Sequence, residues 1–452
     1  MAEKIKHTHF VGIGGIGVSA LALLLKQQGQ QVSGTDRMDS TLLDTLRKAG
    51  ITITIGHEAS AVAGADELVY SSAIREDNPE REYAARHEIP QIRRAEMLGQ
   101  IASAYSHTVA IAGTHGKTTT TGMCGQILVE AGMDPSILVG GILPNMNSNL
   151  RLGAQGTIVL EADEYDRSFL ALSPDRILVT TLEADHLDIY SDLQDVRDTF
   201  LQFISKLDDS GILVMAGDEN ELQLLAERSP VPTIFYGLHE GNHYRAVDVR
   251  ADQFTSVFSI QRGQKTLGEI RLTMPGTHNI MNALGAAALS SEMGVPFAAI
   301  KRGLESFKGV ERRFEQKGVQ NGVLFIDDYA HHPSEVEATL EGARSGWPNS
   351  RIIAVFQPHL YSRTKDFAPE FARSLELADL AIVTDIYPAR EKPIPGVNSE
   401  LITGASDKVR LIPTMTEVVD FLKSEFKQGD LLITLGAGDI WQLHELILGD
   451  ES

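Results

Sequence analysis

The stretch Gly113-Thr114-His115-Gly116-Lys117-Thr118-Thr119-Thr120 decides how the rest of this chain is interpreted. It follows the apolar run Thr108–Ala112 and precedes a helical pattern that continues to Glu130. A strand, a glycine-rich turn and a helix N-terminus form a cradle for phosphate, because backbone N–H groups can approach the phosphate oxygens. Lys117 would supply positive charge to the β- and γ-phosphates, and the Thr118 hydroxyl would hold Mg²⁺. The alternative is a tight surface turn at a helix start.

Length and composition point to a large cytoplasmic protein. The 452 residues predict about three domains of roughly 150 residues each. No apolar run reaches the roughly 20 residues that a membrane span needs, and the N-terminus does not resemble a signal peptide. The single cysteine, Cys124, excludes an intramolecular disulfide and suits a reducing compartment; we interpret it as a packed core thiol.

The formal net charge of −21 argues against two classes of partner. Such a charge repels nucleic acid and acidic membrane surfaces, so we expect no nucleic-acid partner. We expect no membrane insertion, because no apolar run is long enough to span a bilayer. Anionic substrates would have to be held by local basic clusters and by Mg²⁺.

Strand and helix patterns alternate in three successive segments, which predicts parallel sheets. We expect an α/β protein with a Rossmann-like domain over residues 1–106, a central ATPase-type domain over 107–316 and a C-terminal Rossmann-like domain over 317–452. The central sheet should be mostly parallel with an antiparallel subsheet, because Phe254–Ile260 and Leu267–Met274 alternate around a turn at Gly263. A helical run from His278 to Met293 follows.

A second glycine loop lies near the N-terminus. Residues 12–17 read GIGGIG, which matches G-x-G-x-x-G after a strand and before a helix, and Asp36 ends the next strand, where a ribose-binding acid is expected. By itself this pattern suggests an NAD(P)-dependent oxidoreductase, and a non-enzymatic nucleotide sensor or a plain packing turn are further alternatives. Two nucleotide-type loops in one chain favour an enzyme that holds a diphosphate-linked substrate on one domain and ATP on another.

Acidic side chains follow two strands of the central segment. Glu161, Asp163 and Glu164 follow the run Thr157–Leu160, and Asp185 and His186 follow the run Ile177–Thr181. Because the carboxyl ends of parallel strands meet at one edge of a sheet, these groups should gather beside the phosphate loop. Oxygen ligands with one imidazole suit Mg²⁺ or Mn²⁺ bridging phosphates, and a solvated acidic loop is the alternative.

The last third of the chain contains further polar blocks. Asn279 and Asn282 lie three residues apart at a helix start, where they would reach a purine edge or cap the helix. Arg312 and Arg313 would contact phosphates or lie in a solvated hinge. The adjacent histidines His331 and His332 also suggest zinc, but no further ligand has suitable spacing.

These blocks resemble the Mur ligase superfamily, the ATP-dependent amide ligases of peptidoglycan synthesis. The phosphate loop is shorter than G-x-x-x-x-G-K-[ST], because Ile111 stands where the first glycine belongs, and this short form is similar to that of the superfamily. The other matching blocks are EADE (161–164), EADH (183–186), HNxxN (278–282), DDYAHHP (327–333) and QPH (357–359). They span nearly the whole chain and are most similar to the branch that joins L-alanine to UDP-N-acetylmuramate.

The resemblance implies specific roles for residues of this sequence. UDP and the sugar would be bound by Gly14, Gly15, Asp36, Ser71, Ser72 and Arg75. ATP would be bound by Gly113, Thr114, His115, Gly116, Lys117, Thr118, Thr119, Asn279, Arg313 and Asp328. Two Mg²⁺ sites are implied, one at Thr118 and Glu161 and one at His186. Tyr329, His359 and Arg363 would surround the amino acid, and Lys117, His359 and Arg363 would be the catalytic residues.

The resemblance also implies the reaction. The partners would be UDP-N-acetylmuramate, L-alanine and ATP, the product would form through an acyl phosphate, and the protein would be a monomer or weak homodimer. Several sister ligases have a carboxylated lysine about fifteen residues after the histidine of the second acidic block; Leu201–Phe203 occupy that region here, so we expect no carbamate ligand. The alternative within the superfamily is a recycling ligase that adds a tripeptide to the same nucleotide.

Overall fold

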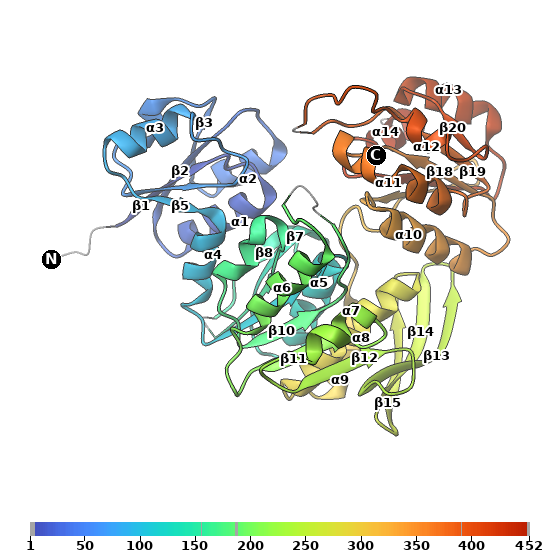
Figure 1. Ribbon diagram of the computed structural model, residues 1–452, viewed down its shortest axis with the longest axis horizontal. Coiled ribbons are helices and arrows are strands. Elements are labelled where there is room, and N and C mark those ends of the chain that lie inside the picture. The colour runs from blue at the N-terminus through green and yellow to red at the C-terminus, as the bar shows by residue number, and fades with distance from the viewer. Residues whose placement is uncertain (1–4, 155, 186–188, 390, 450–452) are drawn as a thin grey trace. The chain divides into compact units, whose positions relative to one another are not determined.

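The computed structural model describes residues 5–154, 156–185, 189–389 and 391–449. Its strands form three sheets, each accompanied by helices (Figure 1). By contacts the chain divides into two compact units. The first unit comprises residues 1–245, 261–267 and 281–307, and the second comprises residues 246–260, 268–280 and 308–452.

The N-terminal sheet has five parallel strands in the order β3-β2-β1-β4-β5. The strands are β1 (His7–Val11), β2 (Gln31–Asp36), β3 (Thr52–Ile55), β4 (Glu67–Tyr70) and β5 (Gln91–Arg93). The helices are α1 (Ile16–Gln27), α2 (Thr41–Lys48), η1 (Ala59–Val62), α3 (Pro79–Arg86) and α4 (Arg94–Ala102). Helix α1 is buried from Val18 to Leu25, because this stretch is almost wholly apolar. Helix α3 begins at an asparagine cap followed by proline, Asn78-Pro79, which is a typical helix start.

The central sheet has ten strands in the order β15-β14-β13-β12-β11-β10-β6-β9-β7-β8. The strands are β6 (His107–Ala112), β7 (Ser136–Leu143), β8 (Ser148–Arg151), β9 (Thr157–Glu161), β10 (Arg176–Val179), β11 (Ile212–Ala216), β12 (Thr233–Gly237), β13 (Tyr244–Asp252), β14 (Thr255–Arg262) and β15 (Lys265–Leu272). The helices are α5 (Lys117–Glu130), η2 (Tyr165–Ala171), α6 (Leu193–Ile204), α7 (Asn220–Ala226), α8 (Thr277–Glu292) and α9 (Phe297–Ser306). Strands β7, β9, β6, β10, β11, β12 and β13 pair in parallel, and β8 is antiparallel to β7.

The C-terminal sheet has six strands in the order β16-β17-β21-β18-β19-β20, with β16 as an antiparallel edge strand. The strands are β16 (Glu315–Gln320), β17 (Val323–Asp328), β18 (Ile352–Phe356), β19 (Leu380–Val383), β20 (Val409–Leu411) and β21 (Leu431–Leu435). The helices are α10 (Pro333–Gly346), α11 (Tyr361–Leu375), α12 (Glu400–Thr403), α13 (Met415–Glu425) and α14 (Gln442–Leu448). All five residues of β18 are buried, and they alternate between two apolar clusters on the two faces of the sheet.

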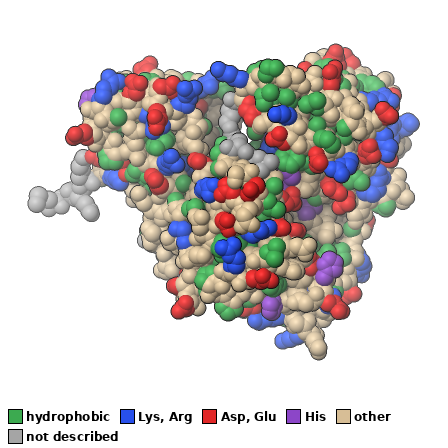
Figure 2. Space-filling model, in the orientation of Figure 1, with side chains coloured by type: hydrophobic (Ala, Val, Ile, Leu, Met, Phe, Trp, Pro, Cys, Tyr) green, Lys and Arg blue, Asp and Glu red, His purple; other side chains and the backbone are tan. Residues whose placement is uncertain are grey.

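The structure confirms the α/β class and the mainly parallel sheets. On the face shown in Figure 2, acidic side chains are interspersed with basic ones, so the acidic excess is spread over that face. Among the described residues, no helix combines the length and the hydropathy needed to cross a bilayer.

Candidate active site

The phosphate loop lies between the carboxyl end of β6 and the first turn of α5. Gly116 caps α5 with a left-handed backbone (φ 81°), which glycine adopts without strain. A Cβ atom at Gly113 would collide with the segment that follows β10. From that segment the Thr181 carbonyl accepts the Thr114 N–H at 3.0 Å, and the Thr181 hydroxyl accepts the His115 N–H at 2.9 Å. The loop geometry therefore requires both glycines and is fixed by the neighbouring strand.

Lys117 is the first residue of α5, and its ammonium group is surrounded by oxygen atoms. Its Nζ donates to the carbonyls of Gly113 at 2.6 Å and Thr114 at 3.0 Å, and to the Glu164 carboxylate at 2.9 Å. Burial would lower the pKa of Lys117, but the surrounding carboxylates, Glu164 foremost, outweigh burial and raise this pKa. Burial raises the pKa of the Glu164 carboxyl to about 7, with Lys117 opposing the rise. Lys117 therefore stays positively charged beside the loop.

Thr118, in the first turn of α5, faces Glu161, the last residue of β9, at the edge where β6 and β9 end in parallel. The Thr118 hydroxyl lies 3.0 Å from both carboxylate oxygens of Glu161, and the Gly140 N–H donates to one of them at 2.8 Å. Both groups are oxygen donors, which are the ligands that Mg²⁺ prefers, so this pair fits a magnesium ion. His186, the predicted ligand of a second ion, lies outside the described residues.

The N-terminal glycine loop is braced by the residue that was expected to bind a ribose. Oδ2 of Asp36 accepts the Gly14 N–H at 2.8 Å. A Cβ atom at Gly14 would lie 2.8 Å from the same oxygen, so any larger residue there would have to displace the Asp36 carboxylate. Asp36 therefore shapes the loop itself, and contacts of Gly14, Gly15 and Asp36 with UDP stay predictions.

Ser71 and Ser72 directly follow β4. Ser72 lines a cavity of about 290 Å³ in the first unit. The other lining residues belong to the start of α4 and to the segment around η2; they are Arg93, Arg94, Ala95, Glu96, Tyr165, Asp166, Arg167, Ser168 and Ala171. Arg75 is not among them, because its side chain is 83% exposed and pairs with Asp77 at 3.4 Å. Arg75 therefore does not line this cavity, and its predicted contact with a pyrophosphate remains untested.

Arg94, which lines this cavity, lies near both the N-terminal glycine loop and the first acidic block. One of its terminal nitrogens would lie 2.9 Å from a Cβ atom at Gly17, in the glycine loop. The other lies 3.9 Å from the Asp163 carboxylate, in the first acidic block. The cavity therefore lies near both the loop predicted for UDP and the acidic block predicted for metal.

In the second unit, Tyr329 lies between the two arginines that precede β16. The guanidinium carbons of Arg312 and Arg313 lie 5.0 and 5.2 Å from its ring centroid. Arg312 also donates to Asp327 at 2.9 Å, so it is anchored to β17 and the solvated-hinge alternative is wrong for it. The arrangement fixes Tyr329 at the carboxyl end of β17.

Histidine rings join the two C-terminal blocks. The His331 ring lies 5.3 Å from Tyr329 and 6.0 Å from His359, and His359 stacks on Tyr387 at 5.9 Å. The structure thus brings Tyr329 and His359 together, as expected from their positions after β17 and β18. The adjacent histidines have different neighbours, since His331 pairs with Glu335 at 3.2 Å whereas His332 contacts the Ser334 hydroxyl at 2.7 Å; the zinc interpretation stays untested.

Arg363 lies in the first turn of α11 and is only 8% exposed. A surface position for this arginine is thereby excluded. Its burial one turn after His359 is compatible with the predicted carboxylate clamp.

Two residues predicted to bind ATP are bonded to nearby backbone. The oxygens of Asp328 accept the N–H groups of Phe314 at 2.7 Å and Ala330 at 2.8 Å, and burial raises its pKa to about 6. The Asn279 amide donates to the Pro275 carbonyl at 2.7 Å; this contact is not an N-cap, in which a side-chain oxygen would accept a backbone N–H. Roles of Asp328, Asn279 and Arg313 at ATP stay predictions.

Sequence reasoning missed two acidic partners. It placed Glu164 in the acidic cluster but did not pair it with Lys117, and it did not single out Glu335, which lies 3.6 Å from Arg313 and also contacts His331. The sequence contains a weak indication of Glu335. It is an acidic residue in the first turn of the helix that follows His-His-Pro, so it lies near the same sheet edge as the histidines.

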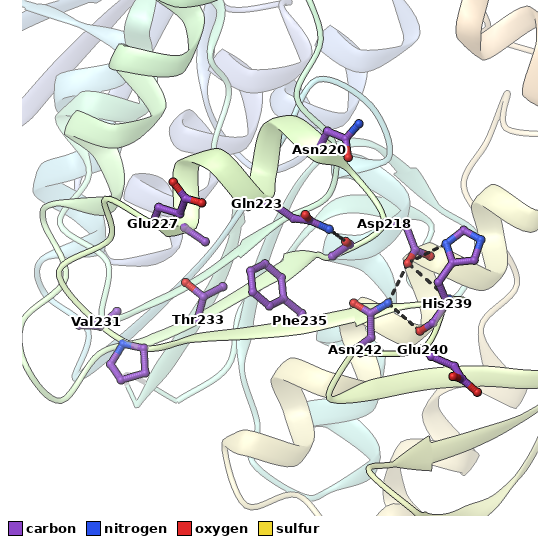
Figure 3. A pocket seen from close by; sticks show the side chains of 14 residues that line it. Asp218, Asn220, Gln223, Glu227, Val231, Thr233, Phe235, His239, Glu240 and Asn242 are labelled. Carbon is purple, nitrogen blue, oxygen red and sulfur yellow. Dashed lines mark hydrogen bonds and ion pairs between the residues drawn. The ribbon is translucent and has the colours of Figure 1, made fainter.

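A larger cavity of about 720 Å³ lies between α7 and β12 (Figure 3). In its wall Asp218 accepts the Leu238 N–H at 2.6 Å and the Asn242 amide at 2.7 Å. None of the predicted site residues lines it. It is therefore distinct from the groups described above.

Family models match most of the chain. Residues 7–106 match the Mur ligase family catalytic domain, residues 111–290 the Mur ligase middle domain, and residues 312–438 the Mur ligase glutamate ligase domain. The chain belongs to the Mur ligase family.

Within this family, the chain is similar over its full length to ligases of one kind. The chain is 44% identical to a UDP-N-acetylmuramate–L-alanine ligase of Geobacter sp. (strain M21), over 99% of this chain and 98% of the relative. It is 42% identical to the ligase of the same name from Salinibacter ruber, over 98% and 94%. Among solved structures, the UDP-N-acetylmuramate–alanine ligase of Thermotoga maritima gives a TM-score of 0.83 at 28% identity, with 98% of both chains covered. A murein peptide ligase of Psychrobacter arcticus gives 0.73 at 25% identity, with the same coverage.

Proposed function

We propose that this protein is an ATP-dependent ligase that joins L-alanine to UDP-N-acetylmuramate in peptidoglycan precursor synthesis in the cytoplasm. The observation that carries the proposal is full-length similarity to ligases of that name, in a chain with two nucleotide-type loops. The products would be ADP, phosphate and UDP-N-acetylmuramoyl-L-alanine. The domains would be residues 1–106 for the UDP substrate, 107–316 for ATP and 317–452 for the amino acid, and the protein would act as a monomer or weak homodimer.

The first step would be phosphoryl transfer to the muramyl carboxylate. A carboxylate oxygen attacks the γ-phosphorus and ADP leaves, which gives an acyl phosphate. Lys117 would neutralise charge on the transferring group, since its ammonium already lies at the loop among the Gly113 and Thr114 carbonyls. Thr118 and Glu161 would hold Mg²⁺, which supplies further charge neutralisation and orients the phosphates. A second ion at His186 belongs to the same proposal.

The second step would be attack of the alanine amine on the acyl carbon. The amine adds, a proton is lost from nitrogen, and the tetrahedral intermediate collapses with loss of phosphate. Arg363 would hold the alanine carboxylate through two hydrogen bonds, with Tyr329 and His359 around the amino acid. Because the amino acid and ATP would be bound on different domains, the chemistry would require domain closure.

Product analysis tests the proposal against the recycling-ligase alternative. The purified protein is given ATP, Mg²⁺ and UDP-N-acetylmuramate with either L-alanine or the tripeptide L-alanyl-γ-D-glutamyl-diaminopimelate, and products are weighed by mass spectrometry. We expect the alanine adduct as the main product. A tripeptide adduct formed faster than the alanine adduct would favour the recycling ligase.

Replacement of Glu161 should change the metal requirement. We expect Glu161→Gln to raise the Mg²⁺ concentration for half-maximal activity by about tenfold, because a neutral amide is a weaker ligand than a carboxylate and loss of about 1.4 kcal/mol corresponds to tenfold. The measurement is a Mg²⁺ titration of the ligation rate at saturating substrates. The matched control is Glu130→Gln. Glu130 is the last residue of α5, at the opposite end of the helix from Thr118, and its side chain pairs with Arg302. An unchanged Mg²⁺ requirement in Glu161→Gln would remove this residue from the metal site.

A further inference from the structure

The N-terminal sheet contains a buried carboxylate for which the proposed reaction has no direct use. Glu80 is the second residue of α3 and is fully buried. Its oxygens accept the Thr35 hydroxyl at 2.8 and 3.0 Å and lie 2.7 Å from ring nitrogens of both His9 and His57. Burying a carboxylate is costly unless it is hydrogen-bonded, and here three side chains satisfy it.

These partners come from three adjacent strands. His9 lies on β1, Thr35 lies on β2 and His57 follows β3. The second ring nitrogen of His9 contacts the Ser33 hydroxyl of β2 at 2.8 Å. Glu80 thus connects helix α3 to three strands at one place in the sheet.

Thr35 connects this cluster to the glycine loop. Its carbonyl accepts the N–H groups of Gly12 and Ile13, both at 2.9 Å. The next residue, Asp36, accepts the Gly14 N–H through its side chain at 2.8 Å. Three successive N–H groups of the loop are therefore held by two adjacent residues at the end of β2.

The hydroxyl of Thr35 points to Glu80 while its carbonyl holds the loop, so the position of the loop depends on the buried cluster. We propose that Glu80 is a positioning residue for the N-terminal glycine loop: through Thr35 it sets the placement of Gly12–Gly14 and thereby the affinity for the UDP substrate. The inference rests on the proposed function insofar as the loop binds UDP-N-acetylmuramate. Glu80 itself would not touch the substrate.

The same domain offers a matched control in Glu67. This carboxylate is also buried, accepts a threonine hydroxyl (Thr8, 2.7 Å) and pairs with Lys6 at 2.7 Å. It is the first residue of β4 and pairs in register with Thr8 near the start of β1, at the amino ends of these parallel strands. The glycine loop follows the carboxyl end of β1, so Glu67 lies at the other end of the sheet from the loop.

The test compares Glu80→Gln with Glu67→Gln in the full-length protein. We expect Glu80→Gln to raise the KM for UDP-N-acetylmuramate by about tenfold, the change expected from one charge-assisted hydrogen bond, with the KM values for ATP and L-alanine within twofold of wild type. Glu67→Gln should leave all three KM values within twofold of wild type, even if it lowers the melting temperature as much as Glu80→Gln does. Equal KM changes in the two variants, or an unchanged KM in a folded Glu80→Gln protein, would overturn the inference.

Thr35 supplies a second pair of variants in case Glu80→Gln does not fold. Thr35→Val removes the hydroxyl and should reproduce the selective rise in KM. Thr35→Ser keeps the hydroxyl, so its KM for UDP-N-acetylmuramate should stay within twofold of wild type. A normal KM in Thr35→Val would also overturn the inference.

Amide hydrogen exchange separates this inference from the proposed function. In Glu80→Gln or Thr35→Val without ligand, the Gly12–Gly14 amides should exchange faster than in wild type, whereas those of the phosphate loop should not change. If wild type forms no ligation product, the proposed function fails, but faster exchange still supports the positioning role and unchanged exchange refutes it.

Discussion

Lys117→Ala is expected to lower the ligation rate by about 1,000-fold or more while leaving the Kd for UDP-N-acetylmuramate within twofold of wild type. Removing one charged group that stabilises a transferring phosphoryl group has effects of about this size. Binding of the UDP substrate should persist, because the N-terminal glycine loop is built from β1, β2 and α1 and does not include Lys117. Single-turnover experiments give the ligation rate, and calorimetric titration with UDP-N-acetylmuramate gives its Kd. If the folded variant bound neither ATP nor UDP-N-acetylmuramate, the separation of the two sites would be refuted.

The stability of this variant needs its own control. Glu164 is almost fully buried, so loss of Lys117 leaves an unpaired carboxylate that would cost about 3–5 kcal/mol of folding free energy. Lys117→Ala combined with Glu164→Gln removes that charge and should recover much of the stability without recovering activity. Lys301→Ala, which alters a surface pair with Glu305 in α9, is the matched lysine control and should retain wild-type activity.

Arg363→Lys is expected to raise the KM for L-alanine by about ten- to a hundredfold and to change the KM for ATP by less than twofold. A planar guanidinium holds a carboxylate through two parallel hydrogen bonds, whereas an ammonium acts as a point charge. Loss of part of such a pair in a buried site costs roughly 1.5–3 kcal/mol, which corresponds to that range. Steady-state titration of alanine at saturating ATP gives the value.

Arg373 on the same helix provides the comparison. Its side chain is 74% exposed and pairs with Glu370 at 3.0 Å, so Arg373→Lys should leave both KM values unchanged. A KM for alanine within twofold of wild type in Arg363→Lys would rule out the clamp.

Much of the fold could be predicted from the sequence because apolar runs and glycines mark the strands clearly. The runs Thr108–Ala112 and Thr157–Leu160 coincide with β6 and β9 to within a residue. Strand β16 was missed because it is an antiparallel edge strand with mostly polar, partly exposed residues. The hairpin of β7 and β8 was missed because Gly140-Gly141 interrupts the apolar pattern.

The candidate site was predicted where each residue follows a strand, because parallel strands place their carboxyl ends together. Glu161 ends β9, and Thr118 lies in the helix that follows the neighbouring strand β6, so the two meet at this edge of the sheet. The pairing of Lys117 with Glu164 could not be read from the sequence, since it depends on side-chain packing between residues 47 positions apart. Asp36 was located correctly, but its hydrogen bond to Gly14 depends on the loop conformation, which no sequence pattern specifies.

The most direct test of the central claim is phosphate release in an omission series with purified protein. We expect rapid phosphate release only when ATP, Mg²⁺, UDP-N-acetylmuramate and L-alanine are all present. One phosphate should form for each UDP-N-acetylmuramoyl-L-alanine. Glycine and serine in place of alanine measure how strictly the amino acid is selected. Phosphate release that does not depend on UDP-N-acetylmuramate and an amino acid, or reduction of NAD(P)⁺ in place of ligation, would contradict the account.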